Sequence, residues 1–185
     1  PSESLLVEAI APMQEPVAAE GARWLFQFLD ARALAIGGPR RQSGLTGQQD
    51  VLKDTGSFFY RFHRIVGLHN TLQVRGYSKE ALRLIEGRRD DTALLPAPLQ
   101  NTLWISRSLP DGLNLTHLEQ LTRGYQVNWQ PSPVANRLRD ESRYGIAELF
   151  LSQKSLYQLI ASASTGDYQS LNGVQRIDGY LQQAL

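Results

Sequence analysis

The chain has 185 residues, of which 42% are hydrophobic and 20% are charged. These proportions are typical of a globular protein and exclude a fully disordered chain or a fibrous repeat. The net charge of +1 is too small to indicate a nucleic-acid or anionic-membrane partner by itself. The absence of cysteine excludes disulfides, thiolate nucleophiles and Cys-ligated metals. It fits a cytosol or a periplasm, so localisation stays open, with the cytoplasm slightly favoured and an extracytoplasmic location not excluded.

Composition also predicts the fold class. Leucine outnumbers isoleucine and valine together, which favours helix because β-branched side chains are the ones that pleated sheets prefer. The predicted fold is all-α, a single-domain bundle of about six to eight helices over residues 1–185. Residues 88–98, charged and then proline-bearing, are a possible subdomain boundary. No run approaches the apolar length of a membrane span, so no membrane insertion is predicted, although a signal or membrane segment before Pro1 could have been removed.

The predicted elements begin with a short apolar segment and alternate with loops. Gly37, Gly38 and Pro39 form a strong stop signal after the first helix, and Ser78 and Gly87 are the expected caps of a short helix. In chain order, the predicted helices cover 16–36, 50–72, 79–86, a short segment from 98 that ends at the turn 110–112, 116–125, 132–164 and 167–181.

The helix over 132–164 is the predicted spine of the bundle. Ser132 is a suitable N-cap, and Pro133 stands at the first helical position. Apolar residues then recur at the three-to-four spacing of a helix that buries one face. Gly145 is the weak point, where close packing or a kink is expected. The core predicted for the whole bundle consists of Trp24, Phe28, Phe58, Phe62, Ile65, Trp104, Leu121, Leu149, Leu156 and Ile177.

The Gly-rich loop over 37–49 contains Arg40 and Arg41, which could hold an anion. The loop lacks the spacing of a P-loop, so a flexible surface connection is the preferred interpretation. His63 and His69 lie six apart, which is not the spacing of metal ligands on one helix face, and no metal site or cofactor is predicted. The carboxylate pairs Asp90–Asp91 and Asp140–Glu141 are interpreted as solvated surface charge, and no catalytic residue is predicted.

The most specific candidate for function is a helix-turn-helix-like segment over 116–139. A recognition helix buried through Val134 and Leu138 would present polar side chains to DNA, where arginine can bind guanine or phosphate and asparagine can bind adenine. The segment departs from the usual pattern, because its turn is long and contains prolines, so an ordinary helical corner is the preferred interpretation. The candidate nucleic-acid-binding residues are Arg123, Asn136, Arg137, Arg139 and Arg143.

Three functions remain open. The leading prediction is a non-enzymatic helical interaction or regulatory module, with a protein partner or self-association, because no catalytic constellation is found. The alternatives are a DNA-binding regulator acting through 116–139 and an extracytoplasmic helical sensor that binds a small ligand. Enzymatic activity is not favoured, because it would require carboxylates from distant segments to meet.

Overall fold

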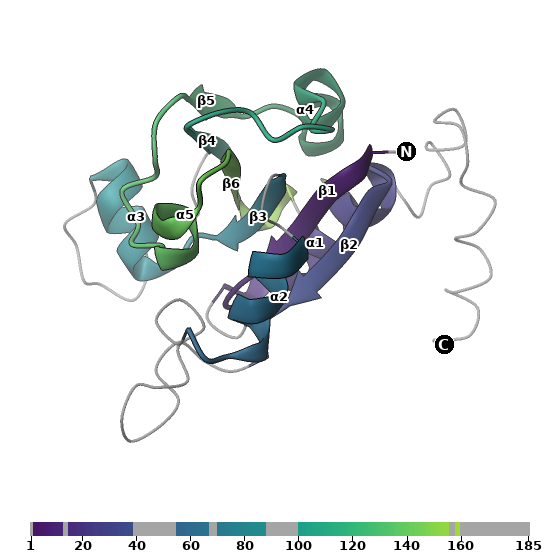
Figure 1. Ribbon diagram of the computed structural model, residues 1–185. Coiled ribbons are helices and arrows are strands. Elements are labelled where there is room, and N and C mark those ends of the chain that lie inside the picture. The colour runs from purple at the N-terminus through teal and green to yellow at the C-terminus, as the bar shows by residue number, and fades with distance from the viewer. Residues whose placement is uncertain are drawn as a thin grey trace, which may run out of the picture.

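The computed structural model describes residues 2–12, 15–38, 55–66, 70–87, 100–155 and 158–159. It is an α/β fold with one six-stranded mixed sheet in the order β2-β1-β3-β6-β4-β5 (Figure 1). The prediction of an all-α bundle is therefore wrong. The possible boundary at 88–98 lies outside the described residues, and strands from both sides of it enter the same sheet.

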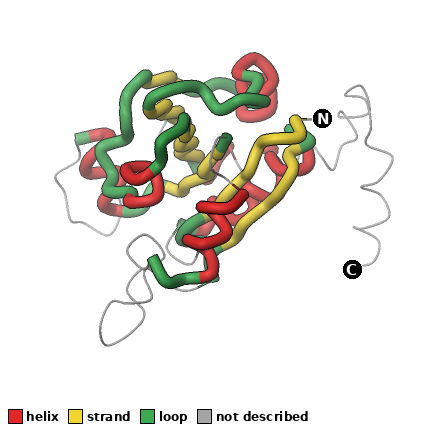
Figure 2. Tube along the Cα trace, viewed as in Figure 1, coloured by secondary structure: helices red, strands yellow, loops and turns green. Residues whose placement is uncertain are grey.

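The strands are short and the helices lie between them in the chain (Figure 2). The strands are β1 (Ser2–Ala9), β2 (Ala31–Ile36), β3 (Thr71–Gly76), β4 (Thr102–Ser106), β5 (Gln126–Asn128) and β6 (Ile146–Leu151). The helices are α1 (Pro16–Phe28), α2 (Phe58–Val66), α3 (Lys79–Glu86), α4 (Leu115–Thr122) and α5 (Arg137–Glu141).

Strand direction divides the sheet into two parts. β2, β1, β3 and β6 are parallel neighbours, whereas β4 runs antiparallel to β6 and carries β5 as a parallel edge strand. A parallel strand in the middle of a sheet is covered on both faces, and the six residues of β3 and the six of β6 are all buried.

The two faces of the sheet differ in chemistry. Helix α1 packs on one face through Ala18, Ala22 and Leu25, which join alternate apolar residues of the strands in the main core. The opposite face, covered by α2 and α5, has a smaller apolar cluster around Phe59 and Leu138 and many polar side chains. The sheet therefore has one apolar and one polar buried face, and the polar face holds α2 and α5.

The long helix predicted over 132–164 does not exist in this fold. Within residues 132–145 only the short α5 is helical, and the chain then forms β6. The sequence IAELFL alternates between the two faces of the sheet, and its apolar residues also happen to match helical spacing. Gly145 is closely packed, since a Cβ atom there would lie 1.9 Å from the carbonyl oxygen of Ser108.

Two other helices were predicted too long, because each predicted range includes the turn after the helix and part of the next strand. The helix predicted over 16–36 ends at Phe28, and the chain turns at Asp30, which has a φ of 49°, into β2. The helix predicted over 50–72 is described only as α2, and its end is replaced by the start of β3.

Where a short helix was predicted from residue 98, the described part of the segment forms β4 instead. The predicted caps of α3 are confirmed: the Ser78 hydroxyl accepts a hydrogen bond from the Ala81 amide, and Gly87 is left-handed. The helix predicted over 116–125 is also present as α4, and Asn114 is its N-cap. The predicted final helix and residues 39–49 lie outside the described residues.

The predicted core is partly confirmed. Leu121 and Leu149 are buried, whereas Phe58 and Ile65 are 82% and 77% exposed, because α2 is short and turns that side to solvent. Four aromatic residues are only partly buried against the core: Trp24, Phe28, Phe62 and Trp104. Leu156 and Ile177 lie outside the described residues.

The packing at Gly145 predicts that Gly145→Ala lowers the free energy of unfolding by about 1–3 kcal/mol, the usual cost of overpacking. The atom that a new methyl group would meet belongs to the backbone and cannot rotate away. Gly38→Ala is the matched control, because no atom lies within 4 Å of the Cβ position there. Urea denaturation of both variants measures the difference, and equal stabilities would contradict the close packing.

Candidate functional site

A row of polar side chains crosses the middle of the sheet. Glu8 of β1, Gln73 of β3 and Glu148 of β6 are register partners, and Trp104 of β4 lies opposite Glu148. The three polar side chains are almost fully buried. Burial of charged groups is costly unless they are paired, so the contacts of this row decide how the overlying elements are held.

Arg75, two residues along β3 from Gln73, pairs with two buried carboxylates. Its Nε and Nη2 donate to Glu15 at 2.8 and 2.7 Å, and its Nη1 donates to Glu148 at 3.2 Å. Burial lowers the pKa of Arg75, but the negative charges of Glu15 and Glu148 raise it more, and the guanidinium stays charged. It also lies 5.2 Å from the centre of the Phe150 ring.

A second guanidinium ties α5 to the same row. Arg139 Nη1 donates to Glu148 at 2.9 Å and also to Ser132 Oγ and to the Val134 carbonyl oxygen. Asn136, the N-cap of α5, donates from its side-chain amide to Gln73 and Glu148. Helix α5 is therefore fixed over the sheet by hydrogen bonds to buried polar groups.

His63 of α2 makes the corresponding contact at the other end of the row. Its Nδ1 lies 2.9 Å from Glu8 Oε1, and Glu8 Oε2 accepts a hydrogen bond from Gln73 at 3.0 Å. The residue is only 3% exposed. Burial lowers the pKa of His63, but the charge of Glu8 and the hydrogen bond to it raise the pKa more, so it lies above its ordinary value of 6.5.

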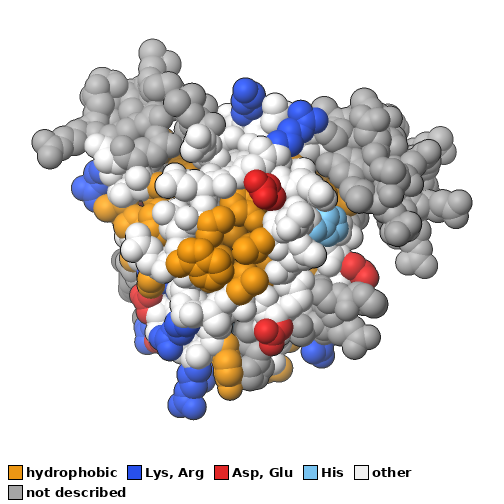
Figure 3. Space-filling model, turned by 90° about the horizontal axis from the view of Figure 1, so that it is seen from above, with side chains coloured by type: hydrophobic (Ala, Val, Ile, Leu, Met, Phe, Trp, Pro, Cys, Tyr) orange, Lys and Arg blue, Asp and Glu red, His pale blue; other side chains and the backbone are white. Residues whose placement is uncertain are grey.

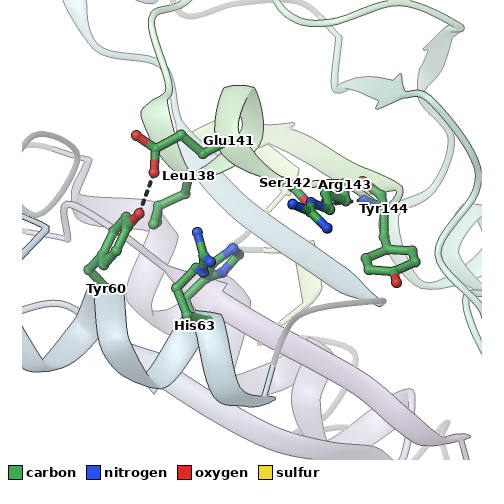
Figure 4. Close-up of a pocket in the computed structure, with 8 residues that line it drawn as sticks. Tyr60, His63, Leu138, Glu141, Ser142, Arg143 and Tyr144 are labelled. Carbon is green, nitrogen blue, oxygen red and sulfur yellow. Dashed lines mark hydrogen bonds between the residues drawn. The ribbon is translucent and has the colours of Figure 1, made fainter.

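Between α2 and α5 lies a cavity of about 570 Å³, here called the α2–α5 pocket. In Figure 4, Tyr60 and His63 rise into it from α2, Leu138 and Glu141 reach down from α5, and Arg143 projects from the following loop. The pocket is lined by Tyr60, His63, Arg64, Leu138, Glu141, Ser142, Arg143 and Tyr144.

The acidic side chain of this pocket is already engaged. Glu141 accepts hydrogen bonds from the Tyr60 hydroxyl and from Arg137, and these bonds lower the pKa of Glu141. The hydrogen bond with Glu141 raises the pKa of Tyr60. Arg64 and Arg143 are exposed, and neither forms an ion pair with a residue that the structure describes. The pocket therefore has an excess of positive charge.

The predicted nucleic-acid-binding residues are not brought together. Asn136 and Arg139 are buried in the polar row, and Arg137 pairs with Glu141 on the surface. Arg143 lines the α2–α5 pocket, whereas Arg123 lies at the C-cap of α4. Residues 116–139 contain most of α4, then β5 and the start of α5, so a helix-turn-helix arrangement is not formed. Binding of nucleic acid itself stays a prediction.

The sequence also singled out the loop arginines and the histidines as candidates. Arg40, Arg41 and His69 lie outside the described residues. Within the described part of the chain, no group of three or more His, Asp or Glu side chains could hold a metal ion. Sequence reasoning treated His63 only as an unsuitable metal ligand and missed Glu8, whose partner lies 55 residues away.

A second pocket of about 490 Å³ lies beside the C-terminal end of α4 and the end of β6. Its polar groups are largely used by the fold: Asn101 holds the Thr122 and Gly124 carbonyl oxygens and the Ser152 amide. Burial raises the pKa of Tyr125 to about 12, and its hydroxyl donates to the Leu115 carbonyl oxygen. These contacts close the end of the sheet.

The face seen from above has a patch of apolar side chains with few charges around it (Figure 3). Patches of this kind often mark protein interfaces. The predicted protein partner or self-association stays a prediction.

Among the described residues, no helix combines the length and the apolar content needed to cross a membrane.

Comparison with protein-family models, with curated proteins and with solved structures finds no match to this chain. The function is therefore argued from the α2–α5 pocket and the polar row beneath it.

The polar row predicts that Arg75→Met lowers the free energy of unfolding by about 3–5 kcal/mol, since two buried carboxylates lose their common partner. Arg83→Met is the control on the exposed side of α3, with an expected change within about 0.5 kcal/mol. Chemical denaturation measures both. A cost below about 1 kcal/mol for Arg75→Met would show that the buried pairs do not support the fold.

The raised pKa of His63 predicts a pH-dependent stability. The folded protein binds this proton more tightly than the unfolded chain, so the stabilisation is fully present below pH 6.5 and is lost as pH rises through the folded pKa. Denaturation at about pH 6 and about pH 8.5 should show this fall in the wild type and a smaller fall in Glu8→Gln. Equal slopes in the two proteins would contradict the role of Glu8.

Proposed function

We propose that the chain binds a small anionic ligand in the α2–α5 pocket. The observation that carries the proposal is the convergence of three basic side chains, His63, Arg64 and Arg143, on a cavity whose acidic residue, Glu141, is engaged by Tyr60 and Arg137.

The size and lining of the pocket support a ligand of this kind. Ligand pockets usually enclose about 300–1,000 Å³, and the α2–α5 pocket falls within this range. Its lining also includes Leu138 and the aromatic rings of Tyr60 and Tyr144, which offer apolar contact area beside the charged groups. Arginine is well suited to anions, because its planar guanidinium can donate two parallel hydrogen bonds to an oxyanion.

The anchoring of the pocket walls supports binding with little rearrangement. Helix α2 is tied to the sheet through His63 and Glu8, and α5 through Arg139 and Glu148. A preformed site loses less free energy in ordering its side chains and backbone on binding. The proposal keeps the small ligand of the predicted sensor and the non-enzymatic role of the predicted regulatory module, without the helical bundle assumed for both.

The test is a calorimetric titration with phenyl phosphate, which combines an oxyanion with an aromatic ring. We expect saturable binding at one site, and we expect Arg64→Ala and Arg143→Ala each to weaken it roughly tenfold or more, because each removes a charged hydrogen-bond donor. Arg61→Ala is the matched control: it removes an exposed arginine of the same helix that does not line the pocket.

Two outcomes would overturn this function. The first is no binding, or an equal loss in Arg61→Ala, which would indicate a general effect of charge. The second is that a labelled DNA duplex binds far more tightly than phenyl phosphate and loses affinity in Arg143→Ala, since Arg143 would then belong to a nucleic-acid surface.

A further inference from the structure

We infer that the anion bound in the α2–α5 pocket is a tetrahedral oxyanion of the phosphate-ester class, and that His63 binds it as an imidazolium through Nε2, so that binding takes up a proton. This inference rests on the proposed function of the same pocket. It adds the chemical class of the ligand and its coupling to pH.

The geometry of His63 leaves one ring nitrogen for a ligand. Glu8 is fully buried and occupies Nδ1, and the carboxylate is itself held by Gln73. Hydrogen bonds to the described residues are found at Nδ1 but not at Nε2. His63 also lines the α2–α5 pocket, so its ring borders the cavity.

The buried charges beneath the pocket favour the protonated ring. Three buried carboxylates, those of Glu8, Glu15 and Glu148, face two buried guanidinium groups, those of Arg75 and Arg139. These five groups carry one negative charge in excess. Protonation of His63 brings the buried cluster to neutrality, and the imidazolium then donates from both nitrogens, one to Glu8 and one into the pocket.

The other charged and titratable groups around His63 have opposing effects. From its own helix come Tyr60 and Arg64, and Arg64 lowers its pKa. From α5 and the following loop come Glu141, which Arg137 neutralises, and then Arg143 and Tyr144. Glu8 of β1 has the largest raising effect on the pKa of His63. An anion between Arg64, Arg143 and His63 would offset their mutual repulsion and favour the proton further.

The number and placement of the donors indicate the class of anion. Arg64 and His63 approach from α2, and Arg143 approaches from the loop before β6. A planar carboxylate offers two oxygens in one plane, whereas a phosphate or sulfate group offers oxygens in three directions. Donors on separate elements therefore favour a tetrahedral anion over a carboxylate.

Sulfate is the first probe, because it remains a dianion over the whole range from about pH 5.5 to about pH 8.5, and any change in affinity must come from the protein. We expect the affinity to fall roughly tenfold or more as pH rises through the pKa of His63, since a charged hydrogen bond is lost. Calorimetry near neutral pH in two buffers of different ionisation enthalpy should also detect proton uptake on binding.

Two variants separate the role of His63 from a structural one. His63→Gln keeps a neutral amide near the position of Nε2, so binding should persist with weaker affinity but without pH dependence. Glu8→Gln should move the pH dependence to lower pH, because Glu8 is a positioning residue that acts through His63. Arg143→Ala should weaken binding and keep the proton uptake. If the His63 or Glu8 variant fails to fold, proton uptake by the wild-type protein on binding sulfate tests the inference, and its absence overturns it.

The outcomes distinguish this inference from the proposed function. If neither sulfate nor phenyl phosphate binds, the proposed function and this inference both fail. If sulfate binds with the same affinity across the pH range and without proton uptake, this inference fails and the anion pocket stands. If acetate binds as tightly as sulfate, the assignment to tetrahedral oxyanions is overturned.

Discussion

The fold depends on the buried ion pairs that Arg75 forms with Glu15 and Glu148. All three side chains are almost completely buried, and an unpaired charge in such a place costs several kcal/mol. The pairing requires three segments to meet: the residue before α1, the C-terminal end of β3 and the middle of β6. Once they meet, the parallel order of β3 and β6 and the start of α1 are determined together.

The same pairing places the pocket. Glu148 is shared by Arg75, Arg139, Asn136 and Ser132, so the carboxylate that closes the ion cluster also holds α5 over the sheet. At the other end of the row, Glu8 holds α2 through His63. The two walls of the α2–α5 pocket are thus attached to β1 and β6, which lie on either side of β3. Their separation at the sheet is therefore set by two strand spacings of about 4.8 Å each, and the hydrogen bond from Tyr60 to Glu141 joins the two helices directly.

Local signals in the sequence predicted local structure. The Ser78 and Gly87 caps of α3 were found because capping chemistry lies within a few residues of the helix end. The strand β3 was missed, although TLQVRG alternates between apolar and polar residues, because the aromatic residues before it continued a helical pattern. The leucine-rich composition then favoured the all-α class, which is wrong. The apolar runs of buried parallel strands reinforced this error, because they resemble the apolar face of a helix.

The site was harder to predict for a physical reason. The partners of Arg75 lie 60 and 73 residues away in the chain, so no spacing rule could have joined them. Arg143 was predicted to face DNA, but it lines the α2–α5 pocket. The sequence could not distinguish the two, because an exposed arginine is compatible with a nucleic-acid surface and with a ligand pocket. His63 could have been noticed as a histidine on an amphipathic helix, but only the structure brings it to Glu8.

A sheet with apolar residues on both faces would tolerate a shift of β3 by two residues, because the faces keep their character after an even shift. In this protein such a shift would place Arg75 opposite Glu8 and remove it from Glu15, leaving a buried carboxylate without its partner. The polar row therefore specifies the register. The five buried charged groups of this cluster carry one negative charge in excess, and Glu8 lies against His63, which can neutralise that charge with a proton. The charge arrangement that fixes the register thus also makes the pocket respond to protons.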